Sequence, residues 1–260
     1  MKLLPHSSAK PSHYDKAAEN YDAFNEKRSL SKNRVIEKIL RRHKVRSVLD
    51  MTCGTGSQVF FLAKRGYDVT GSDINSKMLK IAKAKAKKEK LDIKFLKGDM
   101  RTLKTGTFDA VITIFNAIGH LTKADFEKAI RNINRNLKEG GLYVFDINNL
   151  SYLLKGDNIT SLTIDWQRTG GTAKLRDIQY STINEKGILA SYTTHIEQKG
   201  NRKPEITENA QTLQIYTARQ LREMLHRNGF KVLEQCGLDG SKFLDTKTEC
   251  ILTVGQRHRF

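Results

Sequence analysis

The sequence predicts an α/β fold, in which a mostly parallel sheet is covered by helices on both faces and carries an inserted antiparallel meander. Between residues 45 and 147, short β-branched runs alternate with stretches of helical periodicity, which is typical of βαβ units with right-handed crossovers. From about residue 155 to residue 215 this alternation stops, and runs rich in Thr, Ile and Tyr follow one another with only turns between them. The first region therefore predicts a parallel core, and the second predicts an antiparallel insertion.

The individual elements follow from these patterns in chain order. Residues 13–43 predict two helical stretches, because apolar side chains recur there at helical spacing. In the expected core, the sequence predicts strands at 45–50, 67–72, 92–96, 108–114, 142–147, 230–236 and 249–255. It predicts helices there at 57–65, 75–90, 123–138 and 217–228. The meander predicts strands at 161–168, 173–183, 188–197 and 206–216. We expect an N-terminal helical lid over 1–44, a core from 45–150 and 216–260, and an inserted sheet over 151–215.

Length and composition exclude several classes of protein. The 260 residues are enough for one sizeable core with an appended subdomain, and they contain no apolar run long enough to form a transmembrane helix. The first residues lack the apolar stretch of a signal peptide. The three cysteines, Cys53, Cys236 and Cys250, are widely spaced, which argues against a disulfide framework and against a structural zinc site. We therefore expect a cytoplasmic protein that binds no metal and contacts no membrane.

The positive charge is a weak indication of acidic partners. The formal net charge of +18 is spread over the chain, with +6 in residues 1–50, +8 in 51–150 and +4 in 151–260. Seven lysines lie in the predicted helix around residues 77–90, and a solvated helix face accounts for them. The alternative is a surface that contacts the phosphates of RNA, although no aromatic side chain interleaves with the lysines to stack on bases.

A glycine turn between the first core strand and its helix is the informative motif. The run from Val48 to Gly56 ends in Gly54-Thr55-Gly56, and such a turn lets a ligand approach the backbone and the helix N-terminus. The dinucleotide-binding pattern fails, because Val59 stands where its third glycine belongs. Asp50 at the end of the strand would repel a pyrophosphate and attract a ligand that carries an ammonium and a sulfonium group.

Two further acids stand at the ends of the next strands. Asp73 lies 19 residues after Gly54, where a carboxylate accepts hydrogen bonds from ribose hydroxyls. Asp99 follows the third strand and can accept a hydrogen bond from an adenine amino group. Each acid alone could simply end a strand, whereas three at successive carboxyl ends indicate one binding site.

These residues resemble the class I S-adenosylmethionine-dependent methyltransferases. The resemblance covers about residues 10–150 and, more loosely, 216–260; its motifs are Asp50…Gly54-Thr55-Gly56, Ser72-Asp73, Gly98-Asp99-Met100 and Phe108-Asp109-Ala110-Val111-Ile112. It implies a Rossmann-like, seven-stranded, mostly parallel sheet with S-adenosylmethionine as cofactor. It also implies that Ile74 and Met100 enclose the adenine. The full set of cofactor-binding residues that it implies is Tyr21, Arg28, Asp50, Cys53, Gly54, Thr55, Gly56, Asp73, Ile74, Met78, Asp99, Met100, Phe115 and Asn116.

The loop after the fourth core strand narrows the methyl acceptor. Residues 115–121 contain no proline pair of the kind found in enzymes that methylate exocyclic base amines, and no cysteine near the fourth or fifth strand could attack a cytosine. The layout instead resembles amino-sugar N,N-dimethyltransferases and, more distantly, glycine N-methyltransferase. The fifth strand departs from the amino-sugar pattern, since it ends in Phe145-Asp146-Ile147-Asn148-Asn149 where those enzymes have a Glu-Pro-aromatic run.

Three residues are candidates for a catalytic role. His120 has the intrinsic pKa of a general base and lies on the loop after the fourth strand; its alternative role is to cap the next helix or pack on the inserted sheet. Tyr14 and Tyr21 match the N-terminal tyrosines of the small-molecule subgroup, with aromatic packing as the alternative. Asp146 could hold a substrate ammonium or merely end a strand.

The sequence thus predicts a methyltransferase that moves a methyl group to a small-molecule acceptor, an amine, by in-line displacement at the sulfonium. An RNA- or ribosome-directed methyltransferase is one alternative, which only the charge favours. A regulatory protein that binds S-adenosylmethionine without turnover is the other. The sequence sets neither the acceptor nor the oligomeric state.

Overall fold

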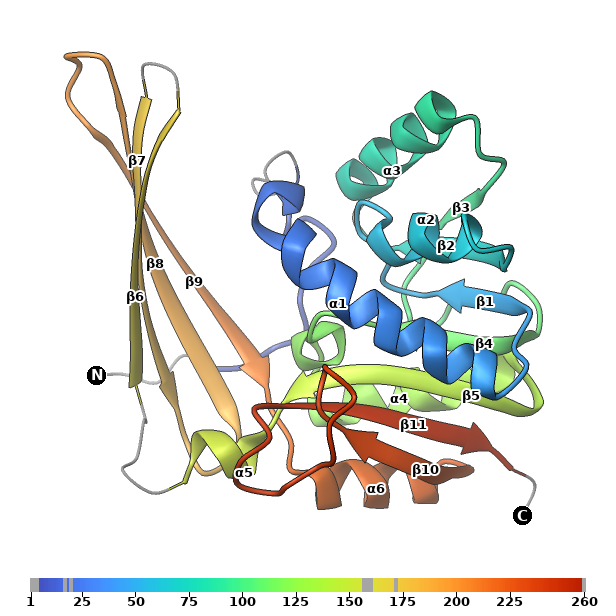
Figure 1. Cartoon of the computed structure of the whole chain (residues 1–260). Coiled ribbons are helices and arrows are strands. Elements are labelled where there is room, and N and C mark those ends of the chain that lie inside the picture. The colour runs from blue at the N-terminus through green and yellow to red at the C-terminus, as the bar shows by residue number, and fades with distance from the viewer. Residues whose placement is uncertain (1–4, 16–17, 19–20, 156–160, 171–172, 259–260) are drawn as a thin grey trace.

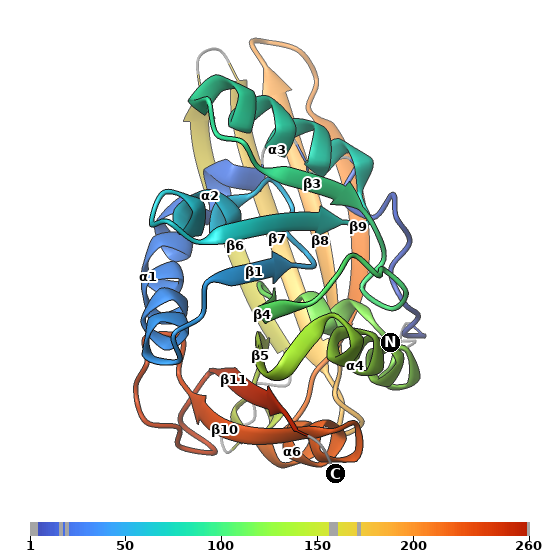
Figure 2. The ribbon, with the colours of Figure 1, turned by 90° about the vertical axis from the view of Figure 1, so that its right-hand side faces the viewer.

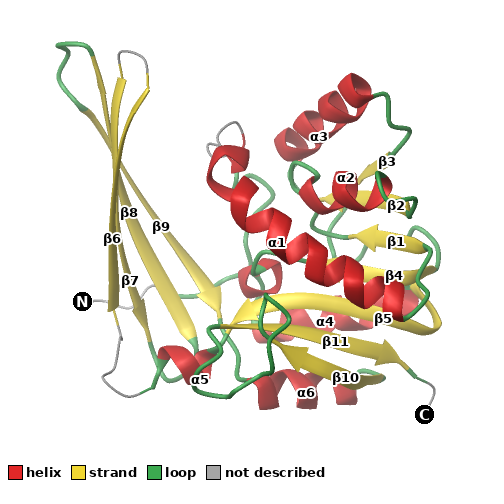
Figure 3. Cartoon of the chain, in the orientation of Figure 1, coloured by secondary structure: helices red, strands yellow, loops and turns green. Residues whose placement is uncertain are grey.

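The computed structural model describes residues 5–15, 18, 21–155, 161–170 and 173–258. It contains two sheets, a seven-stranded one inside the main body and a four-stranded one that stands at one end of the molecule (Figure 1, Figure 3). In the described part of the chain, no helix combines the length and the apolar composition that crossing a membrane requires.

The seven-stranded sheet has the order β10-β11-β5-β4-β1-β2-β3. Its strands are β1 (Ser47–Asp50), β2 (Asp68–Asp73), β3 (Lys94–Lys97), β4 (Phe108–Thr113), β5 (Leu137–Asn148), β10 (Phe230–Cys236) and β11 (Cys250–Arg257). The pairs β3-β2, β2-β1, β1-β4 and β4-β5 are parallel, whereas β11 is antiparallel to both β5 and β10. The predicted Rossmann-like, mostly parallel sheet is therefore confirmed.

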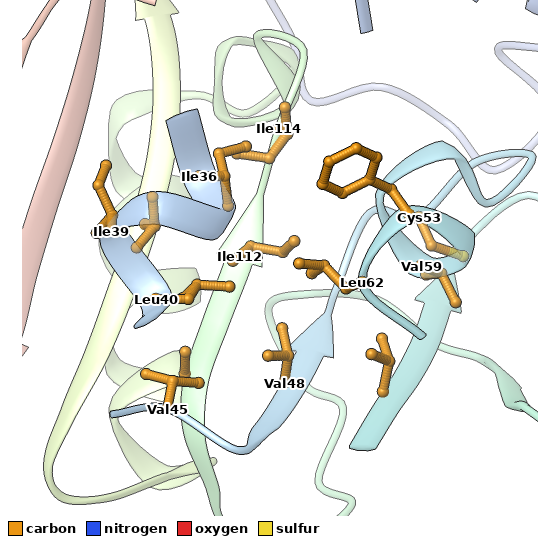
Figure 4. Packing of buried hydrophobic residues seen from close by; sticks show 14 of the residues in the cluster. Ile36, Ile39, Leu40, Val45, Val48, Cys53, Val59, Leu62, Ile112 and Ile114 are labelled. Atoms are coloured by element: carbon orange, nitrogen blue, oxygen red, sulfur yellow. The ribbon is translucent and has the colours of Figure 1, made fainter. Parts of the chain in front are cut away.

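Side-chain alternation along the buried strands divides the core into two layers. Val48 faces one hydrophobic cluster and its neighbour Leu49 faces the other, because successive side chains of a strand point to opposite faces. Helices α1 (Tyr21–Arg42) and α2 (Ser57–Ala63) contribute to the first cluster (Figure 4). Helix α3 (Ser76–Glu89) contributes to it as well. Helices α4 (Lys123–Arg135) and α6 (Ala218–Arg227) contribute to the second, so that helices cover both faces (Figure 2).

The inserted sheet has the order β6-β7-β8-β9, and every neighbouring pair is antiparallel. Its strands are β6 (Ser161–Gly170), β7 (Ala173–Ile183), β8 (Ile188–Lys199) and β9 (Glu205–Gln214), and the short helix α5 (Leu150–Leu153) precedes them. Asn184 accepts the Ile188 N–H at 3.0 Å through its side chain, which closes the β7-β8 turn as its Asn-Glu-Lys-Gly sequence predicts. The predicted antiparallel meander is confirmed.

Two local predictions were wrong. One continuous helix, α1, stands where two helical stretches were predicted within residues 13–43, and residues 11–15 form turns. The helix predicted to run to residue 138 ends at Arg135, because Leu137 already pairs with Phe108 as the first residue of β5. The predicted domain boundaries remain a prediction.

Candidate active site

A pocket opens at the carboxyl ends of β1, β2 and β4, the edge where parallel α/β sheets bind ligands. It encloses about 790 Å³ of empty space, part of it open to solvent, within the range of roughly 300–1,000 Å³ that is typical of small-molecule sites. Nine of the predicted site residues line it: Tyr14, Gly54, Asp73, Ile74, Met78, Asp99, Met100, Phe115 and His120.

The glycine turn contributes Gly54 to the lining of this pocket. Gly54 and Gly56 have φ angles of 53° and 96°, in the left-handed region that glycine adopts without strain. A Cβ on Gly56 would lie 2.5 Å from Cε2 of Phe60, so a larger residue would also displace that ring. The Cys53 N–H donates to the Ser72 carbonyl at 2.9 Å, which ties the turn to β2. The backbone of Gly54 is therefore accessible from the pocket, while Thr55 and Gly56 are buried behind it.

Asp50 is a buried carboxylate with one unused oxygen. Its Oδ1 accepts the Thr52 N–H at 3.1 Å, while its Oδ2 is buried and has no partner among the described residues. Burial, opposed by the Thr52 bond and reinforced by nearby Asp73, raises the pKa of Asp50 from 3.8 to about 8. Such an acid fits the ammonium of the cofactor's methionine portion, because a cation would supply the missing partner.

Asp73 joins the glycine turn to α3. Its Oδ2 accepts the Gly54 N–H and its Oδ1 accepts the Asn75 N–H, both at 2.8 Å. Burial raises the pKa of Asp73, and these backbone bonds partly oppose the rise. Because a carboxylate offers about four acceptor positions, Asp73 can still accept hydrogen bonds from two vicinal hydroxyls in the pocket.

Asp99 is engaged by an arginine that the sequence argument missed. The Arg101 guanidinium donates to Asp99 Oδ1 through Nε at 3.0 Å and to Oδ2 through Nη2 at 2.5 Å, and its Nη1 donates to Asp125 at 2.6 Å. Burial alone would raise the pKa of Asp99, but the bonds from Arg101 hold it below its usual value. Arg101 thus fixes an ionised acceptor beside the apolar walls that Ile74, Met78 and Met100 provide.

The other predicted cofactor residues lie beside the pocket rather than in its lining. Cys53 is buried in the core cluster, where burial raises the pKa of its thiol, and Thr55 is also buried. Asn116 donates its N–H to Asp146 at 3.2 Å and accepts the Asn148 N–H at 2.8 Å. The side chains of Tyr21 and Arg28 lie outside the described residues. The cofactor contacts of this whole set remain predictions.

An amino-terminal segment, residues 5–15, forms a wall of the pocket; it belongs to the expected helical lid, but these residues contain turns and no helix. The Ala9 N–H donates to the His120 carbonyl at 2.8 Å, and the Asn75 side chain donates to the Pro11 carbonyl at 2.8 Å. His6 contacts the Leu121 carbonyl at 3.1 Å and the Thr212 hydroxyl of β9 at 2.9 Å. No periodicity marks this segment, and its concentration of His and Ser residues is the signal that could have found it.

Tyr14 and His120 meet where this segment crosses the pocket. The Tyr14 hydroxyl lies 2.7 Å from His120 Nε2, and the His13 ring stands edge-on to both rings, with centroids 4.9 Å and 5.1 Å away. Burial, with smaller effects from His13 and His6, lowers the pKa of His120 to about 4. His120 is therefore neutral near pH 7, and its Nε2 can accept the hydroxyl proton of Tyr14.

The structure contradicts the proposed role of Asp146 as a holder of the substrate ammonium. Lys32 of α1 already fills that role, with Nζ 2.6 Å from Asp146 Oδ2 and with both side chains almost fully buried, at 8% and 2% exposure. The same ammonium lies 3.9 Å from the centroid of the Phe115 ring. Phe115 and Asn116 both have positive φ, so this ion pair stabilises a strained loop at the pocket wall.

A second hollow adjoins the pocket on the side of the inserted sheet. The two share Ala9, Lys10, His13 and His120. The lining of the second hollow is rich in hydroxyl and amide side chains, which come from Ser7, Ser8, Ser12, Gln211 and Thr212. Lys10 is the one formally charged residue among the described residues that line it. Elsewhere in the described chain, no group of three His, Cys, Asp or Glu side chains is arranged to hold a metal ion.

Comparisons with known proteins agree with this geometry. A family model described as a methyltransferase domain matches residues 48–141. Glycine N-methyltransferase of Oryctolagus cuniculus is 29% identical over 173 residues, which cover 60% of this chain and 54% of that protein. Glycine/sarcosine N-methyltransferase of Parasynechococcus marenigrum is 35% identical over 123 residues, covering 46% and 44%. The chain spans about half the length of the relatives it matches.

Solved structures share the whole fold at low sequence identity. An S-adenosylmethionine-dependent methyltransferase from Clostridium acetobutylicum superimposes with a TM-score of 0.78 at 18% identity, covering 95% of this chain and 99% of that one. A sugar N-methyltransferase from a Streptoalloteichus species gives 0.76 at 20% identity, covering 100% and 99%. Residues 48–141 thus match the methyltransferase-domain family, and the described chain has the fold of these methyltransferase structures.

Proposed function

We propose that this chain is a class I S-adenosylmethionine-dependent methyltransferase, with S-adenosylmethionine as its cofactor, and that it acts on an amine nitrogen of a small, hydroxylated molecule of the amino-sugar type. The observation that carries the proposal is that the pocket and the second hollow share His13 and His120, while the hydroxyl of Tyr14, which lines the pocket, lies 2.7 Å from His120 Nε2. An acceptor in the second hollow would meet the methyl donor beside His120 and Tyr14. The hydroxyl and amide lining suits sugar hydroxyls, because each such group can both donate and accept hydrogen bonds.

Three acidic residues would each bind a different part of the cofactor. Asp50 would pair with the ammonium of the methionine portion, Asp73 would accept the ribose hydroxyls, and Asp99, fixed by Arg101, would accept the adenine amino group. The bound cofactor supplies a methyl group on a positively charged sulfur, which is already activated for displacement. The protein therefore has mainly to position a neutral amine in line with that bond.

Tyr14 would position the acceptor amine. With the tautomer of neutral His120 that has Nε2 unprotonated, Nε2 would accept the Tyr14 hydroxyl proton, which would turn the lone pairs of the phenolic oxygen toward an N–H of the acceptor. As the nitrogen–carbon bond forms and the carbon–sulfur bond breaks, the nitrogen becomes cationic and releases a proton. His120 is a weak base, since its pKa is about 4, so this proton passes to water in the open second hollow.

The names of the relatives favour amine acceptors. They include glycine and glycine/sarcosine N-methyltransferases, and structural neighbours include a sugar N-methyltransferase and an amino pentose methyltransferase. An amino-acid acceptor would bring a carboxylate, for which the second hollow offers only Lys10 as a formally charged partner among its described residues. The composition of the second hollow therefore supports the sugar over the amino acid.

The test is methyl transfer from radiolabelled S-adenosylmethionine to three acceptors: an aminodeoxyhexose, glycine, and total RNA with or without ribonuclease. We expect label in the amino sugar, and we expect Tyr14→Phe to reduce it while cofactor binding is retained. Label in glycine alone would move the assignment to an amino-acid acceptor. Label in ribonuclease-sensitive RNA, or cofactor binding without transfer to any acceptor, would contradict the proposal and favour the RNA-directed or the regulatory alternative.

A further inference from the structure

A hollow between α4 and the loop after β3 adjoins the pocket of the candidate active site. It encloses about 660 Å³ of empty space, part of it open to solvent. We call it the basic hollow, and the residues that line it are Asp99, Arg101, Thr102, Asp125, Lys128, Arg131 and Arg135. Asp99 and Arg101 line the pocket as well, so this ion pair belongs to both spaces.

The lining of the basic hollow has more positive than negative charges. Its cations are Arg101, Lys128, Arg131 and Arg135, and its carboxylates are Asp99 and Asp125. Arg101 donates to both carboxylates, through Nε to Asp99 at 3.0 Å and through Nη1 to Asp125 at 2.6 Å. Asp125 also accepts hydrogen bonds from Lys128 at 3.0 Å and from Ser8 at 2.6 Å. Both acids thus have cationic partners already, and four cations against two carboxylates leave an excess of two positive charges.

This excess lies in a row along α4. Lys128, Arg131 and Arg135 are spaced three and four residues apart, so they share one face of the helix, and all three are exposed. Like charges at this spacing destabilise a helix. Arg131 lies 3.3 Å from the Asn228 side chain and 4.0 Å from Glu127, and the Arg135 side chain has no ion pair or hydrogen bond to any described residue. An anion bound between these side chains would relieve their repulsion.

We propose that the basic hollow binds a small phosphate-bearing ligand in its dianionic form. Two negative charges balance the excess of the lining, and guanidinium groups donate to phosphate oxygens in pairs. Donors available to the ligand include the Arg135 guanidinium and the Thr102 hydroxyl, which have no partner among the described residues. Arg101 bonds the two acids through Nε, Nη1 and Nη2, which leaves one N–H on each of the last two atoms.

A strand of nucleic acid fits the basic hollow less well than a small ligand does. None of the residues that line the hollow is aromatic, so no ring is available there to stack on a base. The row from Lys128 to Arg135 covers about 10 Å of helix, at 1.5 Å per residue. That length corresponds to only about three phosphates of one strand.

A phosphate in the basic hollow acts on the pocket through Arg101. The same guanidinium fixes Asp99, to which we assign the adenine amino group, so this step rests on the proposed function. The phosphate competes with Asp99 for Arg101, and its charge repels the carboxylate. Phosphate and cofactor therefore oppose each other's binding, and each weakens the other by the same factor, about fivefold.

Calorimetric titration of the whole chain with inorganic phosphate, at constant pH and ionic strength, tests the site without the cofactor. We expect one site per chain, and we expect Arg135→Gln to weaken phosphate binding about tenfold. Thr102→Val keeps the net charge and should weaken it about threefold. Arg34→Gln is the matched control, because it removes an exposed arginine from α1 and should leave phosphate affinity unchanged.

The proposal is overturned if wild type binds no phosphate, or if Arg34→Gln weakens binding as much as Arg135→Gln, since binding would then follow the net charge of the chain. Total RNA that binds through Arg135 when free phosphate does not would assign the hollow to a nucleic-acid backbone instead.

Titration with S-adenosylhomocysteine, with and without saturating phosphate, tests the link to the pocket. Wild type should bind it about fivefold more weakly with phosphate present. Arg135→Gln should lose this effect and keep the wild-type affinity without phosphate, because Arg135 does not line the pocket. An S-adenosylhomocysteine affinity that phosphate leaves unchanged would overturn the competition for Arg101. A chain that bound phosphate and no S-adenosylhomocysteine would contradict the proposed function while supporting the phosphate site.

Discussion

The strands of the parallel core and those of the inserted sheet differ in burial. In β5, Tyr143, Val144 and Phe145 are all fully buried, because helices cover both faces of the core sheet. In β9, most side chains from Glu205 to Gln211 are exposed. The core strands are therefore packed on both faces, whereas the inserted sheet leaves much of β9 accessible to solvent.

The buried ion pair of the core gives the largest expected effect. Lys32→Met leaves the Asp146 carboxylate buried and unpaired, so we expect a loss of about 3–5 kcal/mol in the free energy of unfolding. The Phe115 ring would also lose the cation at its face. Urea denaturation followed by circular dichroism measures the loss.

The double variant Lys32→Met with Asp146→Asn is the control for this prediction. It removes both charges, so most of the lost stability should return. An unchanged unfolding free energy in Lys32→Met would show that the pair is solvated. The core at this point would then tolerate substitution as well as the inserted sheet does.

The second effect concerns cofactor affinity. Asp73→Ala removes the acceptor that we assign to two ribose hydroxyls, and two such bonds of about 1.5 kcal/mol each correspond to roughly 100-fold weaker binding. Calorimetric titration with S-adenosylhomocysteine measures it. Asp68→Ala is the matched control, because it changes the exposed acid at the other end of the same strand, β2. Affinity within twofold of wild type in Asp73→Ala would remove Asp73 from the site.

In both regions, the elements that the sequence could predict are those marked by local patterns. The core strands and helices were predictable because apolar periodicity and glycine turns are local signals, and the acids at the strand ends follow directly from them. The four strands of the insertion were predictable from their turns. Helical stretches were predicted where α1 lies, but the continuity of α1 was missed, because its buried face includes Lys32 and Asn33, which break the apolar pattern that marks a helix.

The missed site residues depend on contacts between distant parts of the chain. Arg101 matters because it reaches both Asp99 and Asp125, and Asn75 matters because it holds residue 11 of the amino-terminal segment. Lys32 contacts Asp146 across 114 positions of sequence. No local periodicity encodes such contacts. The lowered pKa of His120 could not be predicted from the sequence either, because it depends on burial by a segment more than 100 residues away.

The third effect is a change of about tenfold in cofactor affinity for each pH unit. Asp50 keeps its proton in the folded chain up to about pH 8, so its contribution to the stability of the free protein falls as pH rises from 3.8 to about 8. Pairing with the ligand ammonium requires Asp50 to lose that proton, so affinity should rise through this range. It should fall again above about pH 8, where an α-amino group deprotonates.

Isothermal titration at several pH values tests this, with Asp50→Asn as the comparison. The variant should lose the acidic limb of the profile and keep the basic one. In wild type, binding near pH 7 should release about one proton, which appears as a dependence of the measured enthalpy on the buffer. An affinity that stays level from pH 6 to 8 would contradict the assigned partner of Asp50.

The fourth effect lies at the boundary between the two regions. Tyr14→Phe and His120→Ala each remove the same hydrogen bond, and we expect each to lower kcat about tenfold with little change in cofactor affinity. Because the two side chains act as a unit, the double variant should be no slower than the slower single variant. If the two losses multiplied instead, Tyr14 and His120 would be acting separately, and His120 would regain an independent catalytic role.

The smallest effect lies within the inserted sheet. Ser181 and Ser191 share one buried hydrogen bond, so Ser181→Ala removes this partner of the Ser191 hydroxyl and should cost about 1 kcal/mol, whereas Ser191→Ala leaves the Gln179 amide as a donor to Ser181 and should cost less. The double change removes both polar groups and should restore stability nearly to wild type, since no cavity larger than an oxygen atom forms. The double-mutant cycle, read from chemical denaturation, therefore shows a coupling of about 1 kcal/mol. A double variant that lost as much stability as both singles together would show that this sheet is packed as tightly as the core, and the contrast between the two regions would fail.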